Sequence, residues 1–185
     1  MKRTVAIAGV WMLLASVPLF AQRKKDPLTD QQIEDVREAG DQPLVRIKLF
    51  VGYVDERAKE IHSLNTDASA QNKSAQMHNL FDEFTRLSDE LQDNMDAFND
   101  EHADLRKVLK EVIDKSGEWT TALNEPKPSA QYDFMRKSAI DANQSVHDAA
   151  TQMLADEVKY FADKKKADKE AEKNADKNAD KNETR

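Results

Sequence analysis

The spacing of the apolar residues constrains the fold more than any other feature of this sequence. Apolar side chains recur alternately three and four positions apart, first in Leu44, Ile47, Val51, Val54, Ala58 and Ile61. This spacing places side chains along one stripe of an α-helix. After Pro126 and Pro128 a last helix is predicted from Ser129, in which the rhythm returns with Met135, Ala139, Ala142, Val146, Ala149 and Met153. The sequence therefore predicts an all-α fold, an antiparallel helical bundle of three to four core helices.

The middle of the chain predicts one long central helix over about residues 74–124. Its stripe is Met77, Leu80, Phe84, Leu87, Leu91, Met95, Phe98, His102, Leu105, Leu109, Val112, Ser116, Trp119 and Leu123. No glycine or proline falls between Lys73 and Ser116, and the phase never changes. One helix of about 75 Å is favoured. The alternative is a turn at Asn99–Asp100, which would give four helices of similar length with better-buried stripes.

A short helix is predicted before the bundle because both of its ends carry signals. The segment Leu28-Thr29-Asp30-Gln31-Gln32 can form a capping box, in which Thr29 caps the helix and Gln32 reaches back. Gly40 is expected to end this helix. Asp41 is then expected to cap the next helix, with Pro43 in its first turn.

The two ends of the chain do not belong to the predicted core. Residues 1–21 combine Lys2 and Arg3, an uncharged apolar run, Pro18 and a small Ala21, which is typical of a secretory signal peptide. An uncleaved membrane anchor is the alternative, but the run is short for a span of about 20 residues. Residues 22–27 read as a linker, and residues 28–163 as the bundle domain. Residues 164–185 repeat Ala-Asp/Glu-Lys-Asn/Glu without any large apolar side chain, which predicts a disordered tail.

Composition excludes several classes of protein. The chain contains no cysteine, so a disulfide scaffold, a cysteine-ligated zinc or iron–sulfur site and a thiol enzyme are all excluded. Loss of Lys2 and Arg3 with the signal peptide would leave 26 basic against 35 acidic residues, a net charge of −9. Such a surface disfavours nucleic acid and anionic lipid. We expect a periplasmic or secreted protein that does not insert into a membrane after signal cleavage.

Candidate metal ligands are few, and no catalytic motif is found. None of the four histidines follows an acidic residue by three positions, as di-metal bundles require. The weak candidates are His78 with Asp82 and the acidic helix face Asp89, Asp93, Asp96, Asp100 and Asp104, for which a solvated face is the ordinary explanation. No nucleophile motif or glycine-rich phosphate loop occurs. We therefore expect no enzyme, no catalytic residue and no cofactor.

Four aromatic residues are the candidates for binding a partner. Phe50, Tyr53, Phe81 and Phe134 fall beside the apolar stripes rather than on them, so we expect them to be partly exposed. Such side chains could line a groove for a peptide or an unfolded client. The leading hypothesis is an exported, non-enzymatic helical protein of interaction or structural role, which binds another protein or itself as a homodimer.

The segment Leu28–Gln32 also resembles the Leu-Thr-x-x-Gln motif of periplasmic Spy- and CpxP-like proteins. The resemblance covers five residues, and the motif occurs once here whereas that family carries it twice. It implies a small helical ATP-independent chaperone or envelope-stress sensor, which is the first alternative function, acting through Phe50, Tyr53 and Phe81. A divalent-cation-binding bundle is the second alternative.

Overall fold

The computed structural model describes the backbone of residues 25–183 and the side chains of residues 25–172. This part of the chain contains five α-helices and no strand. They are α1 (Asp30–Ala39), α2 (Pro43–Thr66), α3 (Lys73–Asp100), α4 (Arg106–Asn124) and α5 (Asp133–Glu183). The all-α prediction is confirmed, and the predicted signal peptide lies outside the described residues.

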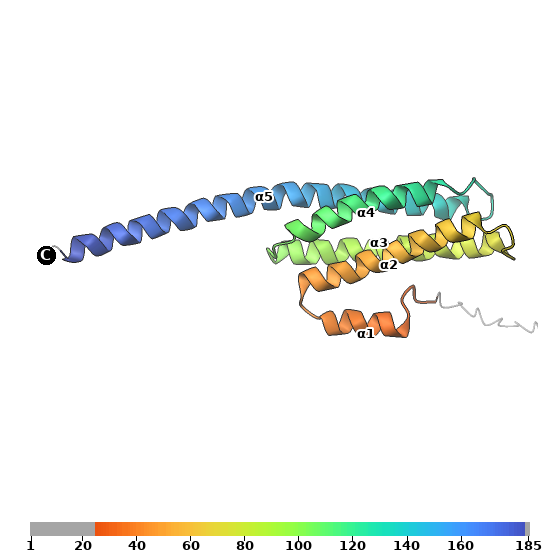
Figure 1. The fold of residues 1–185 in the computed structure, drawn as a ribbon, viewed down its shortest axis with the longest axis horizontal. Coiled ribbons are helices and arrows are strands. Elements are labelled where there is room, and N and C mark those ends of the chain that lie inside the picture. The colour runs from red at the N-terminus through yellow and green to blue at the C-terminus, as the bar shows by residue number, and fades with distance from the viewer. Residues whose placement is uncertain (1–24, 184–185) are drawn as a thin grey trace, which may run out of the picture.

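The four long helices pack side by side, and each contacts two of the others. Helix α2 contacts α3 and α4, and α5 contacts the same two helices, whereas α1 packs against α2. Consecutive helices α3 and α4 therefore lie diagonally across the bundle. Figure 1 shows α2 and α4 running in one direction and α3 and α5 in the other. The hairpin pairs α2–α3 and α4–α5 are thus antiparallel, while α2–α4 and α3–α5 are parallel neighbours.

The core consists largely of the side chains that the apolar spacing predicts. Most stripe residues are buried: Ile47, Val51, Val54, Ala58, Ile61, Met77, Phe84, Leu87, Leu91, Met95, Phe98, Leu105, Leu109, Val112, Ser116, Trp119, Leu123, Ala139, Val146 and Met153. Leu80, Met135, Ala142 and Ala149 are only partly buried. Leu44, in the first turn of α2, is 40% exposed, and His102 is exposed in a turn.

The predicted single helix over residues 74–124 is wrong, because the chain reverses between Asp100 and Arg106. His102 adopts a left-handed conformation with φ of 56°. The N–H groups of His102 and Ala103 donate to the carbonyl oxygens of Asn99 and Phe98 at 2.9 and 3.1 Å, which is a Schellman helix end. The reversal lets two stripes of moderate length face the core, where one long helix would leave half of its stripe uncovered.

Helix α1 begins and ends as the sequence predicts, whereas two later helix starts differ. Gln32 N donates to Thr29 Oγ1 at 3.2 Å and Thr29 N donates to Gln32 Oε1 at 2.9 Å, completing the capping box. Gly40 follows the helix with φ of 49°. The cap of α2 is Gln42 rather than Asp41, with Pro43 as its first residue. Helix α5 begins at Asp133, after a turn that starts at Ser129, the predicted first residue.

Helix α5 continues well past the bundle, as Figure 1 shows. Its backbone is helical to Glu183 and so includes most of the segment that the sequence predicts to be disordered. All side chains from Ala162 to Glu172 are exposed, which agrees with the predicted lack of a face to bury. Alanine, lysine and glutamate favour helix, and Lys166 Nζ pairs with Asp163 Oδ1 at 3.2 Å. Disorder of this segment in solution stays a prediction.

Within residues 25–183, no helix combines the length and the apolar character needed to cross a bilayer.

Candidate functional site

The four aromatic residues predicted to bind a partner divide into three buried and one exposed. Phe50, Tyr53 and Phe81 lie in the core, whereas Phe134 is 80% exposed near the start of α5. The expectation of partial exposure is wrong for the first three, because aromatic neighbours fill the space beside the stripes. Phe50 and Tyr53 pack edge to face with ring centroids 6.1 Å apart, and Phe81 lies 5.7 Å from the Tyr132 ring.

Two arginines hold the irregular segment that precedes α1. Arg57 on α2 donates from Nη2 to the carbonyl oxygen of Pro27 at 2.8 Å, while its Nε donates to Glu83 Oε2 on α3 at 2.6 Å. Arg86 on α3 donates to the carbonyl oxygen of Lys25 at 2.7 Å. We call Arg57 and Arg86 the arginine clamp. Because the clamp binds backbone carbonyls, it fixes the path of this segment without depending on its side chains.

The Tyr53 hydroxyl lies beneath α1 and makes no hydrogen bond within the described part of the chain. Helix α1 crosses α2 here, since Gln32 Nε2 donates to Glu56 Oε2 at 3.0 Å. Burial raises the pKa of Tyr53, and the carboxylates of Asp35 on α1 and Glu56 on α2 raise it further. A buried hydroxyl without an acceptor costs about 1–3 kcal/mol. The contact between α1 and α2 therefore contains an unsatisfied donor.

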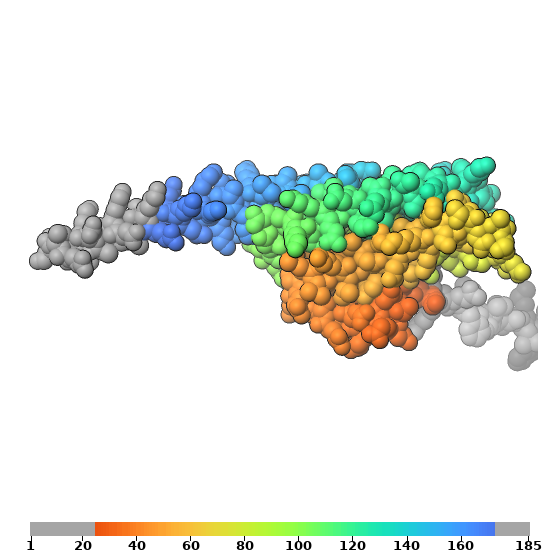
Figure 2. All heavy atoms as spheres, viewed as in Figure 1, coloured from red at the N-terminus to blue at the C-terminus, as the bar shows by residue number. Residues whose placement is uncertain are grey.

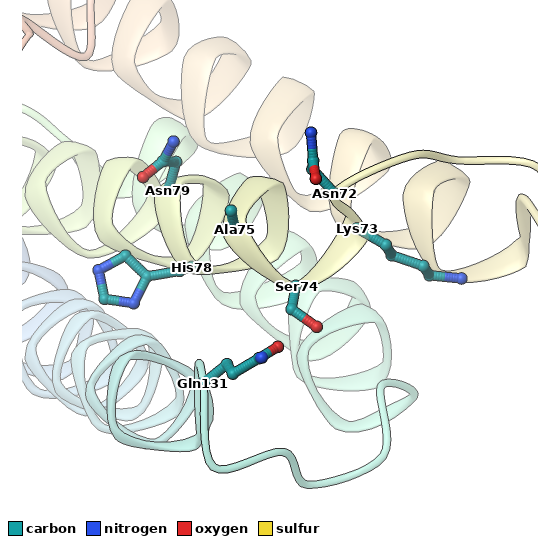
Figure 3. A pocket seen from close by; sticks show the side chains of 7 residues that line it. All are labelled: Asn72, Lys73, Ser74, Ala75, His78, Asn79 and Gln131. Carbon is teal, nitrogen blue, oxygen red and sulfur yellow. The ribbon is translucent and has the colours of Figure 1, made fainter.

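His78 borders an open pocket of about 530 Å³ at the start of α3. The rest of its lining is Asn72, Lys73, Ser74, Ala75, Asn79 and Gln131. Figure 3 shows Ser74 and Gln131 turned toward each other, with the His78 imidazole to one side of them. Neither around His78 and Asp82 nor elsewhere among the described residues do three His, Asp or Glu side chains gather as metal ligands would.

Four of the five predicted carboxylates lie exposed along α3, namely Asp89, Asp93, Asp96 and Asp100. Partial desolvation by the neighbouring side chains and the charge of Asp93 raise the pKa of Asp89. Partial desolvation and the charges of Asp93 and Asp100 likewise raise the pKa of Asp96. Asp104 is separated from this face because α3 ends at Asp100. Its Oδ2 accepts from Arg106 Nη2 at 2.6 Å.

The turn between α3 and α4 meets α5 in a smaller pocket of about 290 Å³. The residues that line it are Asn99, Asp100, His102, Ala103, Asp156, Glu157, Tyr160 and Phe161. The His102 ring stacks on Tyr160 with centroids 5.0 Å apart. Glu157 is buried, and its Oε2 accepts the Leu105 N–H at 3.0 Å, so α5 caps the start of α4. Sequence reasoning missed Glu157, although it falls four residues after Met153 on the apolar stripe.

We expect Glu157→Gln to gain stability relative to the wild type as the pH rises. Burial raises the pKa of Glu157 despite the opposing hydrogen bond from Leu105, so the folded chain holds this proton more tightly than the unfolded chain. Below the ordinary glutamate pKa of 4.5, this proton makes its full contribution to the free energy of unfolding. The contribution is lost as the pH rises through the higher pKa that Glu157 has in the folded chain. Urea unfolding of both chains from about pH 4 to about pH 8 measures the difference.

Asp55 provides a control of opposite sign for that experiment. Burial alone would raise its pKa, but hydrogen bonds from Lys59 and Trp119 and the charge of Lys115 lower it. The ionised Asp55 side chain therefore stabilises the fold at pH values above the ordinary aspartate pKa of 3.8. This stabilisation is lost as the pH falls through the lower pKa that Asp55 has in the folded chain. The loss in free energy of unfolding caused by Asp55→Asn should therefore become smaller as the pH falls. If the two variants change in the same direction, the assignment of Glu157 is contradicted.

A serine–histidine pair links α4 and α5, with Ser116 buried and His147 partly exposed. Ser116 Oγ lies 2.8 Å from His147 Nδ1 and also donates to the carbonyl oxygen of Ile113 at 2.8 Å. Asn143 on α5 donates to the Ser116 carbonyl oxygen at 3.0 Å and to Thr120 Oγ1 at 2.8 Å. The Ser116 side chain is 1% exposed. These hydrogen bonds between α4 and α5 fix the register of the two helices, because a different register would leave buried polar groups without partners.

These features define a four-helix core with a short docked helix and a protruding helical end. No protein-family model matches the chain, and the comparisons found no characterised protein and no solved structure similar to it.

Proposed function

We propose that the chain is an exported, non-enzymatic interaction protein that binds a protein partner through the protruding part of α5. We call residues 162–183 the arm. The observation that carries this proposal is that α5 stays helical to Glu183, while every described side chain from Ala162 to Glu172 is exposed. Isolated helical ends fray in water. A partner helix or surface would supply the packing that the bundle does not.

The arm begins where apolar and aromatic side chains reach the surface. Val158 is 51% exposed and Tyr160 is 41% exposed, and both immediately precede the arm. Farther along, lysines and acidic residues alternate with alanine, so the charge is nearly balanced. Such a surface favours a partner that combines a small apolar contact with complementary charges of both signs.

The other parts of the molecule support interaction more than catalysis. Ser116 is 1% exposed, and its hydroxyl is held by His147 and the Ile113 carbonyl oxygen. A chaperone acting through Phe50, Tyr53 and Phe81 would need those buried side chains to be uncovered. Export rests on the predicted signal peptide, residues 1–21, and a periplasmic or secreted location is part of this proposal.

Photocrosslinking in the cell envelope tests the arm directly. A crosslinking amino acid at Glu170, exposed on the arm, should yield a covalent adduct. The same group at Lys110, exposed on α4, is the matched control and should yield none. An adduct of twice the chain mass identifies a second copy, and any other mass identifies a different protein. The proposal fails if Glu170 gives no adduct, or if both positions give the same one.

Removal of residues 163–185 separates binding from folding. Because the described arm side chains are exposed, we expect the free energy of unfolding to change by no more than about 0.5 kcal/mol. Position 160 remains in the truncated chain. A crosslinker placed there should form an adduct in the full-length chain and none in the truncated chain. Persistence of that adduct would locate the partner on the bundle instead.

A further inference from the structure

We propose that the pocket between the α3–α4 turn and α5 binds the guanidinium group of an arginine side chain that the partner of the arm presents. We call it the turn pocket, and the lining residues that carry the argument are Asp100, Asp156, Glu157, Tyr160 and Phe161. The inference rests on the proposed function and names the chemistry of the partner. Figure 2 shows α5, in blue, running on past the green end of the bundle, where this turn lies. Because Tyr160 and Phe161 directly precede the arm, a partner bound to the arm lies next to the pocket.

The turn pocket has room for one side chain rather than for a large ligand. Its volume is about 290 Å³, slightly below the value of about 300 Å³ at which pockets for drug-sized ligands begin. Asn99 and Asp100 line it from the end of α3, His102 and Ala103 from the turn, and the other lining residues from α5. A side chain bound there would contact all three segments and so join the base of the arm to the turn.

Three carboxylates give the turn pocket a negative charge that the chain itself does not offset. Within the described part of the chain, no lysine, arginine or histidine forms an ion pair with Asp100, Asp156 or Glu157. Glu157 is 5% exposed, and its two oxygens accept only the Leu105 N–H, at 3.0 and 3.3 Å. The charge of Arg106 acts on Glu157 through space, without direct contact. A cation bound in the pocket would therefore meet complementary charge, part of it on a buried group.

The aromatic wall of the turn pocket favours a guanidinium group over an ammonium group. His102 stacks on Tyr160, and Phe161 meets the same ring edge to face, at centroid distances of 5.0 and 5.1 Å, so the wall is formed before any ligand binds. A guanidinium group stacks on aromatic rings while it donates to carboxylates, whereas an ammonium group is compact and strongly hydrated. The chain contains an example of this pairing, because the Arg106 guanidinium lies 4.4 Å from the Phe161 centroid. That guanidinium donates to Asp104 at 2.6 and 2.8 Å, so its hydrogen bonds are not directed at the pocket carboxylates.

Titration of the full mature chain with capped single residues tests the turn pocket without knowledge of the partner. The probes are Nα-acetylarginine methylamide and its lysine and citrulline counterparts, followed through the NMR signals of the Ala103 and Glu157 amides. We expect saturable shifts with arginine, about threefold weaker binding of lysine, and no binding of citrulline, which has the shape of arginine without its charge. Asp100→Asn combined with Asp156→Asn should weaken arginine binding about fivefold, as the loss of two surface ion pairs predicts.

Two further sets of variants separate a built site from a general attraction of opposite charges. Asp141→Asn combined with Asp148→Asn removes the same charge from exposed positions of α5 outside the pocket and should leave arginine binding unchanged. Tyr160→Phe should bind arginine as the wild type does, whereas Tyr160→Leu should bind it about threefold more weakly. Shifts that never saturate, binding of citrulline as tight as that of arginine, or equal losses in the two double variants would disprove the site. Lysine binding as tight as arginine binding would contradict the guanidinium assignment.

Crosslinking in the cell envelope shows whether the arginine belongs to the partner. The pair Asp100→Asn and Asp156→Asn should lower the yield of the adduct formed through Glu170, whereas the pair Asp141→Asn and Asp148→Asn should not. If the arginine probe binds but the adduct yield is unchanged, the partner is not the source of the arginine, and the arm proposal stands. If the wild-type chain forms no adduct, the arm proposal fails together with the partner as the source, while the titration still decides whether the pocket binds a guanidinium group.

Discussion

Replacement of Trp119 by alanine is expected to lower the free energy of unfolding by about 4 kcal/mol. The side chain is 1% exposed on α4 and meets the diagonal helix α3 through an edge-to-face contact with Phe84, with ring centroids 6.1 Å apart. Its Nε1 donates to Asp55 Oδ1 on α2 at 3.0 Å. Three helices therefore lose contacts together. Urea unfolding followed by helical circular dichroism measures the loss.

Trp119→Phe is the matched control for this prediction. Phenylalanine keeps most of the apolar volume but loses the hydrogen bond to Asp55, so we expect a cost of about 1–2 kcal/mol. Trp119 is also the only tryptophan outside the predicted signal peptide, so fluorescence reports unfolding of the wild-type mature chain. An alanine variant that loses less than about 1 kcal/mol would contradict a central position for this side chain.

Arg57→Ala should produce the second-largest loss, about 3 kcal/mol. Arg57 is 8% exposed and makes its Glu83 and Pro27 contacts at 2.6 and 2.8 Å. Its removal leaves the partly buried Glu83 carboxylate without its cation and releases the segment before α1. Hydrogen exchange should therefore accelerate in α1 while the amides in the middle of α3 stay protected.

Arg86→Ala tests whether this effect is specific to Arg57. Arg86 is only partly buried and makes its clamp contact through one hydrogen bond, of 2.7 Å. We expect a loss of no more than about 1 kcal/mol and a smaller acceleration of exchange in α1. Equal losses for the two arginines would mean that the buried ion pair with Glu83 contributes little.

The buried face of each helix was predictable because it follows from the spacing of apolar residues that are close together in the sequence. The stripe from Ile47 to Ile61 and the one from Met77 to Phe98 are buried where the spacing places them. The capping box at Thr29 and Gln32 was predictable for the same reason, since its partners lie three residues apart. The helix end at Asp100 corresponds to the turn at Asn99–Asp100 that the sequence offered only as an alternative, because the apolar spacing continues through it. A Schellman turn usually has glycine in the left-handed position, and here that position is His102.

The candidate site was harder to predict because it depends on contacts between distant segments. Tyr53 lies beside its stripe, and its burial depends on the neighbouring Phe50 ring and on the position of α1. Arg57 lies 30 residues from Pro27, and Leu105 lies 52 residues from Glu157. No local pattern specifies such pairs. A charged residue on an apolar stripe was the available sign for Glu157, and its partner could not be named from the sequence.

The continuity of α5 has a mechanical consequence. No glycine or proline occurs from Asp133 to Glu183, so the arm and the bundle share one uninterrupted rod. The arm alone spans about 33 Å at 1.5 Å per residue. A sideways pull on its far end acts as a lever whose fulcrum is the end of the bundle. The contacts nearest this point are the hydrogen bond from Leu105 to Glu157 and the stacking of His102 on Tyr160. A force on the arm would therefore act on the reversal between α3 and α4.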